Sequence, residues 1–375
     1  MQHVTSVGLD VHARSIKAAS LNYLTGEVQH RSFKNSPAEV AEWILSLESP
    51  KAVYESGVTG FHLARELRAL GVDCVVGAVS KMQKPAADKR QKTDRKDAEF
   101  LARLLATHNI VEVHVPDTEC EAARDLSRAL EDAREELSAS KQRLSKFLLR
   151  HGFCFDEANE RGQRKKAWGR AWWDWLGRIE FGDAADAETL DYYVDRVRSC
   201  EAEKRRLDKL VAKHAQLPRW RMRVDALRCV KGIETAIAFA LVVEADTFSH
   251  FSSAEGFAAW CGLVPSEHSS GEHRAQGGIS KAGNKHVRKL LIEAAWHYAT
   301  ASRRPKDAAR TKDVPDEIRL HANKAVRRLV DKRAEMAAAR KRSCVANCAT
   351  ARELACWCWA IGCMAEGAEG QRAQR

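Results

Sequence analysis

The chain of 375 residues carries a formal net charge of +11, and 45% of its residues are hydrophobic. This composition excludes a disordered or fibrous protein and suffices for two or three domains. The longest uninterrupted apolar run, residues 236–243, is too short to span a bilayer, and the first residues lack a secretory signal pattern. We therefore expect a cytoplasmic protein without a membrane partner, whose basic surplus suits a polyanion.

The first part of the chain predicts a mixed α/β domain. Strand-forming runs cover residues 4–11, 16–22, 28–33, 52–55 and 72–79. Helices are expected from Pro37, behind the cap Ser36, and over residues 59–70. Three strands followed by alternating helix and strand is the order of an RNase H-like domain.

Four carboxylates occupy distinctive positions in this domain. Asp10 ends the first strand and Glu55 ends the fourth. Asp94 and Asp97 stand three residues apart, on one face of a helix expected over residues 94–105. Each acid alone could be a turn, loop-cap or helix-start residue, since acids are favoured at helix N-termini. Acids on two strands and a following helix can instead converge, and phosphodiester cleavage uses two hard cations about 4 Å apart held by such carboxylates.

The middle of the chain predicts a helical connector. From residue 118, apolar residues step by four and seven: Leu126, Leu130, Leu137, Leu144 and Leu148. This heptad-like seam predicts a long helix packed on a partner helix or subunit, and it favours a homo-oligomer. A second helix is expected over residues 191–217. Core packing explains the intervening tryptophans (Trp168, Trp172, Trp173 and Trp175) more simply than stacking on bases.

The eleven cysteines contain no CxxC pair, which favours small buried side chains over a metal site.

The last part of the chain predicts a small, mostly helical domain. Residues 229–236 resemble a helix-hairpin-helix turn, in which Lys231 and Gly232 can approach a phosphate. A loop rich in glycine and serine follows at 262–271, and a helix is expected over 286–299. Basic residues concentrate at 81–103 and 303–342.

Two blocks of motifs resemble the DEDD transposases of bacterial insertion sequences, the group typified by IS110. The front block is Gly8-Leu9-Asp10-Val11-His12, Tyr54-Glu55-Ser56-Gly57 and residues 92–98 (KTDRKDA). The back block is Lys231-Gly232-Ile233, Gly262-Leu263-Val264-Pro265, Ser269-Ser270-Gly271 and residues 278–284 (GISKAGN). The resemblance covers roughly residues 4–110 and 225–300.

The resemblance implies a composite active site. Its RuvC-like acidic domain would bind Mg²⁺, two ions per site with Mn²⁺ as a substitute, through Asp10, Glu55, Asp94 and Asp97. Its C-terminal domain would supply a serine nucleophile, which matches Ser270. Ser269 and Ser280 remain alternatives, and His268 is a candidate base.

The resemblance also implies donor and target DNA as substrates and a structured guide RNA that recognises them by base pairing. The protein would act as a dimer that pairs further on DNA. The residues expected to contact nucleic acid are Lys81, Lys84, Lys89, Arg90, Lys92, Lys231, Gly232, Lys281 and Arg288.

Three other functions share part of this pattern. A RuvC-like junction resolvase would share the acids but not need Ser270. An actin-like sugar kinase needs a second glycine-rich phosphate loop after an acid, and Gly277-Gly278 follows Ala275-Gln276 instead. A catalytically inactive binding protein would not need all four acids.

The sequence thus predicts an α/β plus α protein in four parts. These are a RuvC-like, RNase H-fold domain (1–110), a helical coiled-coil connector (111–225), a transposase domain (226–302) and a basic helical tail (303–375).

Overall fold

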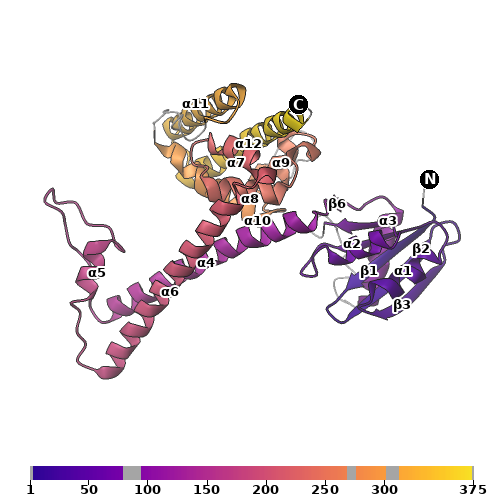
Figure 1. Ribbon diagram of the computed structural model, residues 1–375, viewed down its shortest axis with the longest axis horizontal. Coiled ribbons are helices and arrows are strands. Elements are labelled where there is room, and N and C mark those ends of the chain that lie inside the picture. Colours follow the sequence, from indigo (N-terminus) through magenta and orange to yellow (C-terminus); the bar gives the residue numbers. More distant parts are fainter. Residues whose placement is uncertain (1–2, 79–93, 268–275, 301–311, 374–375) are drawn as a thin grey trace. The chain divides into compact units, whose positions relative to one another are not determined.

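The computed structural model describes residues 3–78, 94–267, 276–300 and 312–373 (Figure 1). They form two compact units, Met1–Thr118 and Glu119–Arg375. No helix among the described residues is long and apolar enough to cross a membrane.

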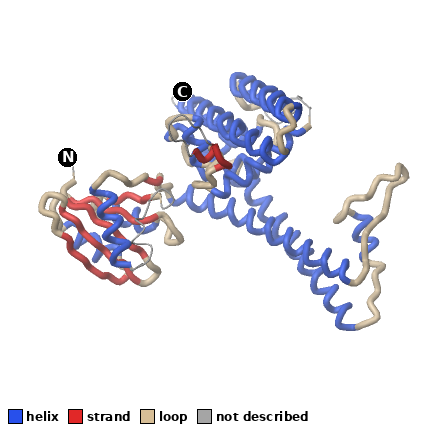
Figure 2. Tube along the Cα trace, turned by 180° about the vertical axis from the view of Figure 1, so that it is seen from behind, coloured by secondary structure: helices blue, strands red, loops and turns tan. Residues whose placement is uncertain are grey.

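The first unit contains a six-stranded mixed sheet, drawn in red in Figure 2. Its strands are β1 (Thr5–Val11), β2 (Ser15–Asn22), β3 (Val28–Lys34), β4 (Pro50–Glu55), β5 (Cys74–Gly77) and β6 (Glu112–Val113). Their order is β3-β2-β1-β4-β5-β6, with β1, β4 and β5 parallel and the other pairings antiparallel. This arrangement is consistent with the expected RuvC-like, RNase H-like sheet, to which β6 adds a short edge strand.

Three helices cover the two faces of this sheet: α1 (Pro37–Leu45), α2 (His62–Ala69) and α3 (Asp94–Ala106). The Ser36 side chain accepts a hydrogen bond from the Glu39 amide, so α1 begins where its capping signal predicts. Val7 and Leu9 of β1 pack in one core with residues of α1 and α2. The alternate residues of the strand therefore face α3.

Gly8 determines how closely α3 can approach β1. A Cβ atom at Gly8 would lie 2.0 Å from the Ala98 carbonyl oxygen and 2.6 Å from the Ala102 amide nitrogen, both in the backbone of α3. Any larger residue would push the helix away. The glycine thus brings the first turn of α3 close to the end of β1, where Asp10 lies.

The second unit is mostly helical. Its helices are α4 (Thr118–Arg150), α5 (Arg170–Leu176), α6 (Ala184–His214), α7 (Pro218–Arg228), α8 (Thr235–Ala245), α9 (Ala254–Trp260), α10 (Lys285–Ala295), α11 (Asp316–Ala338) and α12 (Ser343–Ala373). The described residues of this unit also form two 3-10 turns, η3 (Phe248–His250) and η4 (Trp296–Ala299), and a two-stranded sheet of β7 (Pro265–Glu267) and β8 (Gln276–Ile279).

Helices α4 and α6 lie side by side as a long hairpin (Figures 1 and 2). Leu144 and Leu148 of the predicted seam are buried with Val197 of α6, and the Ser140 hydroxyl lies 3.6 Å from the Cys200 sulfur. The seam is therefore covered by a helix of the same chain and does not require a second subunit. Helix α6 begins at Ala184 rather than residue 191, because Asp183 caps it by accepting from the Ala185 amide at 2.8 Å.

The tryptophan cluster packs at the end of this hairpin. Trp172 is buried against Leu144 and Phe147, and its ring centroid lies 4.1 Å from that of Trp168. This arrangement supports the core-packing interpretation. All eleven cysteines are free, and among the described residues no cysteine belongs to a metal-ligand cluster.

Helix α12 completes the main core of the second unit. Its Leu354 and Ile361 are fully buried in the same cluster as Phe239 of α8 and Leu291 of α10. The two ends of the hairpin join this cluster through Cys120 and Val211. The described residues of 226–302 and of the tail therefore share one core, and the described part of the tail packs as a structural cover.

A buried carboxylate ties three helices of this unit together. The Glu244 side chain at the end of α8 is only 2% exposed. Arg128 of α4 donates to its two oxygens at 2.7 and 3.0 Å, and Asn284, the cap of α10, donates at 2.7 Å. These bonds satisfy the carboxylate, so the contact fixes α4, α8 and α10 against one another.

Candidate functional site

Strand register places two of the predicted acids side by side. Leu9 of β1 lies opposite Tyr54 of the parallel strand β4, so the next residues, Asp10 and Glu55, occupy matching positions where the strands end. Val53 packs in a cluster with Leu101 of α3, and Glu55 has the same parity as Val53. Asp10 and Glu55 therefore belong to the face of the sheet that α3 covers.

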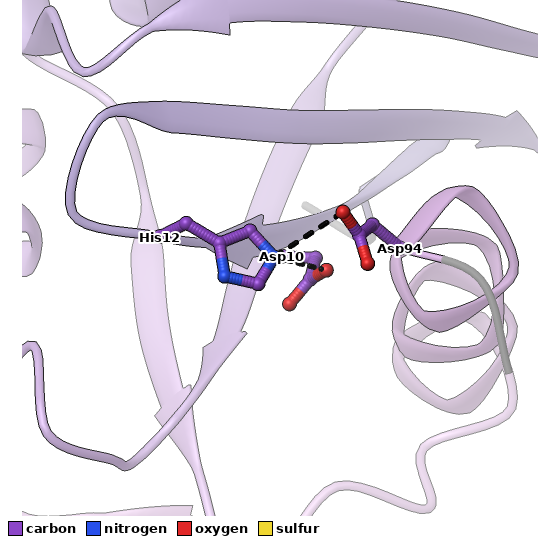
Figure 3. Close-up of side chains that lie close together, drawn as sticks. All are labelled: Asp10, His12 and Asp94. Carbon is purple, nitrogen blue, oxygen red and sulfur yellow. Dashed lines mark hydrogen bonds and ion pairs between the residues drawn. The ribbon is translucent and has the colours of Figure 1, made fainter.

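The first turn of α3 brings a third acid to the same place. The imidazole of His12, just beyond β1, points toward both Asp10 and Asp94 (Figure 3). Its Nε2 atom lies 3.1 Å from Oδ2 of Asp10 and 3.5 Å from Oδ2 of Asp94. One ligand atom from each of the three residues lies within 4.8 Å of the other two, and this group is the candidate metal-binding cluster among the described residues.

The surroundings of Asp10 disfavour its ionised form. Partial burial raises the pKa of Asp10 above its usual range, Asp94 and Asp97 raise it further, and His12 offsets part of the effect. A carboxyl group whose ionised form is disfavoured by neighbouring acids gains when a cation binds between them. The donor set therefore fits a divalent metal.

The other two acids lie outside this group of three. Asp97 is half-buried one turn further along α3, near enough to affect Asp10, and Glu55 is half-buried at the end of β4. The structure thus brings Asp10 and Asp94 together directly and places Glu55 and Asp97 on the same side of the sheet. His12 was not predicted as a site residue, although its position two residues after Asp10 places it on the same face.

The expected serine nucleophile belongs to the segment that links the two strands of the small sheet. Ser270, Ser269 and His268 lie outside the described residues, between β7 and β8 in the sequence. Glu267 and Gln276, the residues on either side of this segment in the sequence, pair with each other across β7 and β8. The alternative Ser280 is exposed, and its amide donates to the Val264 carbonyl at 2.8 Å.

The predicted nucleic-acid contacts have mixed surroundings. Lys81, Lys84, Lys89, Arg90 and Lys92 lie outside the described residues. Burial lowers the pKa of Lys231, whose Nζ donates to the Thr300 hydroxyl at 3.2 Å. Lys281 is exposed, whereas Arg288 is half-buried and donates to the Cys261 carbonyl at 3.1 Å.

Gly232 lies in the turn between α7 and α8 with φ of +84°, and a Cβ there would meet the Ala294 carbonyl at 2.7 Å. Gly232 and Arg288 therefore have structural roles whether or not they also bind nucleic acid.

Comparison with known proteins identifies the family. A sequence model of the IS110 DEDD transposases matches residues 7–153, and the model described as "Transposase IS116/IS110/IS902 family" matches residues 224–313. A protein of Sinorhizobium fredii named "Putative transposase y4qE" is 36% identical over 311 residues, covering 82% of this chain and 74% of its own length. The chain belongs to the IS110 family of transposases.

Two further similar proteins are also named as transposases. The "Transposase for insertion sequence element IS1533" of Leptospira borgpetersenii is 29% identical over 353 residues, covering 90% of this chain and 99% of its own length. The "Probable family 20 transposase" of Pseudomonas aeruginosa is 27% identical over 301 residues, covering 78% of this chain and 83% of its own.

The predicted resemblance is confirmed, and the protein is a DNA transposase. Membership of the DEDD family implies DNA substrates and divalent-metal use, in agreement with the acidic cluster.

Proposed function

We propose that this transposase cuts and exchanges DNA strands with a divided active site. In it, Asp10, Glu55, Asp94 and Asp97 hold Mg²⁺, for which Mn²⁺ can substitute, and Ser270 attacks the scissile phosphate. The observation that carries the proposal is the meeting of Asp10 with Asp94, together with the register that puts Glu55 beside Asp10. When bound, the metal supplies positive charge for the developing charge of the leaving oxygen.

The chain's own residues then have defined tasks. The acids fix the position of the phosphate by way of their bound cation, because β1, β4 and α3 are rigid elements. Gly8 holds α3 at the distance at which Asp94 reaches the end of β1. Ser270 supplies the attacking hydroxyl, which is weak at neutral pH and needs a base or a metal to activate it.

We also propose that a structured guide RNA selects the donor and target DNA. The surplus of Lys and Arg, 62 against 51 acids, supports backbone binding to nucleic acid. We further propose that the protein acts as a dimer and that two dimers assemble on DNA.

The metal half of the site is tested by Asp10→Asn. The change removes a charged ligand without adding bulk, so cleavage should fall by about a thousandfold or more while DNA and RNA binding persist. Single-turnover cleavage and gel-shift titrations with one preparation of protein measure both. A variant that loses binding in parallel with cleavage would instead make Asp10 a structural residue.

The serine half is tested by trapping a covalent adduct. Wild-type protein with guide RNA and DNA should form a protein–DNA adduct that survives denaturation and maps to Ser270 by mass spectrometry, and Ser270→Ala should form none. Ser280→Ala serves as the matched control and should form the adduct. Normal cutting by Ser270→Ala without any adduct would favour a RuvC-like nuclease that uses water.

A further inference from the structure

We infer that His12 is a direct nitrogen ligand of the bound metal, and that it makes this site bind Mn²⁺ more tightly than Mg²⁺. The inference rests on the proposed metal site and extends it beyond the four acids. His12 lies just beyond β1, and its imidazole points toward Asp10 and Asp94, with which it forms the cluster (Figure 3).

The donor separations suit a shared cation. Nε2 of His12 lies 3.1 Å from one carboxylate oxygen, on Asp10, and 3.5 Å from another, on Asp94. Ligands at right angles around an octahedral cation, each about 2.1 Å from it, lie about 3 Å apart. A single N–H on Nε2 points in one direction and cannot serve both carboxylates well. A cation between the three atoms satisfies all of them at once.

The backbone holds His12 in this position. Its amide donates to the Ser15 carbonyl at 2.9 Å, which closes the turn between β1 and β2. The Asn35 side chain donates to the carbonyls of His12 and Ala13 at 3.4 and 3.3 Å. The imidazole therefore extends from a fixed turn toward Asp10 and Asp94, as a preorganised ligand requires.

The ligand type sets the metal preference. Mn²⁺ also binds oxygen ligands well, but as a softer cation it accepts an imidazole nitrogen more readily than Mg²⁺, which prefers oxygen ligands and keeps several waters. A site with four acids and no nitrogen would discriminate weakly between Mg²⁺ and Mn²⁺. A site with His12 as an added ligand should favour Mn²⁺.

The experiment uses the full-length protein with Mn²⁺ alone and reads the metal directly. Electron spin echo spectroscopy should detect a directly coordinated imidazole nitrogen on Mn²⁺ in wild-type protein, and His12→Ala should abolish this signal. Calorimetric titration should show Mn²⁺ affinity lowered by about tenfold or more in His12→Ala, with Mg²⁺ affinity changed by less than about threefold. His12→Asn, which offers an oxygen in place of nitrogen, should also lose the nitrogen signal while keeping part of the affinity.

The matched control is His62→Ala. His62 is exposed on α2 and faces a single carboxylate, that of Glu66 at 4.0 Å. This variant should bind Mn²⁺ with the affinity of the wild type and give the same imidazole nitrogen signal.

Bound Mn²⁺ without a nitrogen signal in the wild type, or a signal that persists in His12→Ala, would overturn the role of His12 and leave the acidic site intact. Absence of Mn²⁺ binding in the wild type, under conditions in which the protein is folded, would overturn the metal site and the role of His12 together.

Discussion

Asp10 of the first unit and Glu244 of the second are both carboxylates at the ends of secondary-structure elements, yet their surroundings are opposite. Glu244 is almost fully buried and receives hydrogen bonds from Arg128 and Asn284. Asp10 is 23% exposed and shares its surroundings with Asp94, Asp97 and a histidine. Glu244 thus has its countercharge inside the protein, whereas Asp10 lies among other acids, as expected of a carboxylate whose proposed countercharge is a bound cation.

The two pKa values move in opposite directions. Burial by itself would raise the pKa of Glu244, but the hydrogen bonds and charge of Arg128 outweigh it, so the pKa falls below the usual range of a glutamate. The pKa of Asp10 rises, because burial and its acidic neighbours act together against the partial offset from His12. Ionised Glu244 therefore stabilises the fold, whereas ionised Asp10 costs stability until a cation binds.

The largest expected effect in this comparison comes from removing the internal countercharge. Arg128→Ala removes the arginine that neutralises the buried Glu244 and leaves it the hydrogen bond from the uncharged Asn284, which should lower the unfolding free energy of the second unit by about 3 kcal/mol. Denaturant titration followed by circular dichroism measures the change. Arg206→Ala, which breaks an exposed pair with Glu203, is the control and should leave the transition unchanged.

The loss of stability in Arg128→Ala should depend on pH. Because the pKa of Glu244 is lowered on folding, its contribution is present above the unfolded value of about 4.5 and is lost as the pH falls through the folded value. The difference between wild type and Arg128→Ala should therefore shrink on acidification below that range. A difference independent of pH would mean that packing of the Arg128 stem, rather than charge, holds the helices.

A smaller loss of stability is expected when the acids are moved apart. Gly8→Ala places a methyl group against the backbone of α3 and should destabilise the first unit by about 2 kcal/mol, as overpacking does. It should also weaken Mn²⁺ binding, because Asp94 moves away from Asp10. Gly182→Ala, where nothing lies within 4 Å of the added atom, is the control. If Gly8→Ala binds the metal as tightly as the wild type, the close packing of α3 on β1 is not what positions Asp94 for metal binding.

The smallest expected effect is an increase in thermal stability. Asp10→Asn removes a charge that is disfavoured in the metal-free protein, so the melting temperature of the first unit should rise by about 2 °C without metal. Added Mg²⁺ should stabilise the wild type more than the variant. Scanning calorimetry with and without the ion measures both. A variant less stable than the wild type in the absence of metal would show that Asp10 is a structural residue like Glu244.

Much of the first unit could be predicted because its signals are local. Alternating apolar residues fix the strands, and the cap Ser36 fixes α1. Asp10, Glu55 and Asp94 could be grouped because strand ends and the next helix start meet at one edge. The need for a glycine at position 8 could not be predicted, because it arises from the contact of β1 with α3. A close approach between segments that are distant in the sequence leaves no local pattern.

The second unit was harder to predict because its organisation depends on distant contacts. The seam of α4 shows that a partner exists, but not that the partner is α6 of the same chain. The start of α6 was missed because the cap Asp183 lies in a polar stretch without an apolar period. The packing of α12 rests on pairs such as Gly362 and Phe248, where a Cβ would lie 2.4 Å from the aromatic ring.

The placement of α12 also bears on how the protein is made. Its Glu366 accepts hydrogen bonds from the amides of Phe248 and Ser249 at 2.6 and 3.0 Å, more than a hundred residues earlier in the chain. During synthesis the first unit can fold as soon as it leaves the ribosome, because the contacts of its core lie within it. The core of the second unit is complete only when α12 has been made, so a prematurely terminated chain would carry the acids of the first unit without the full core of the second.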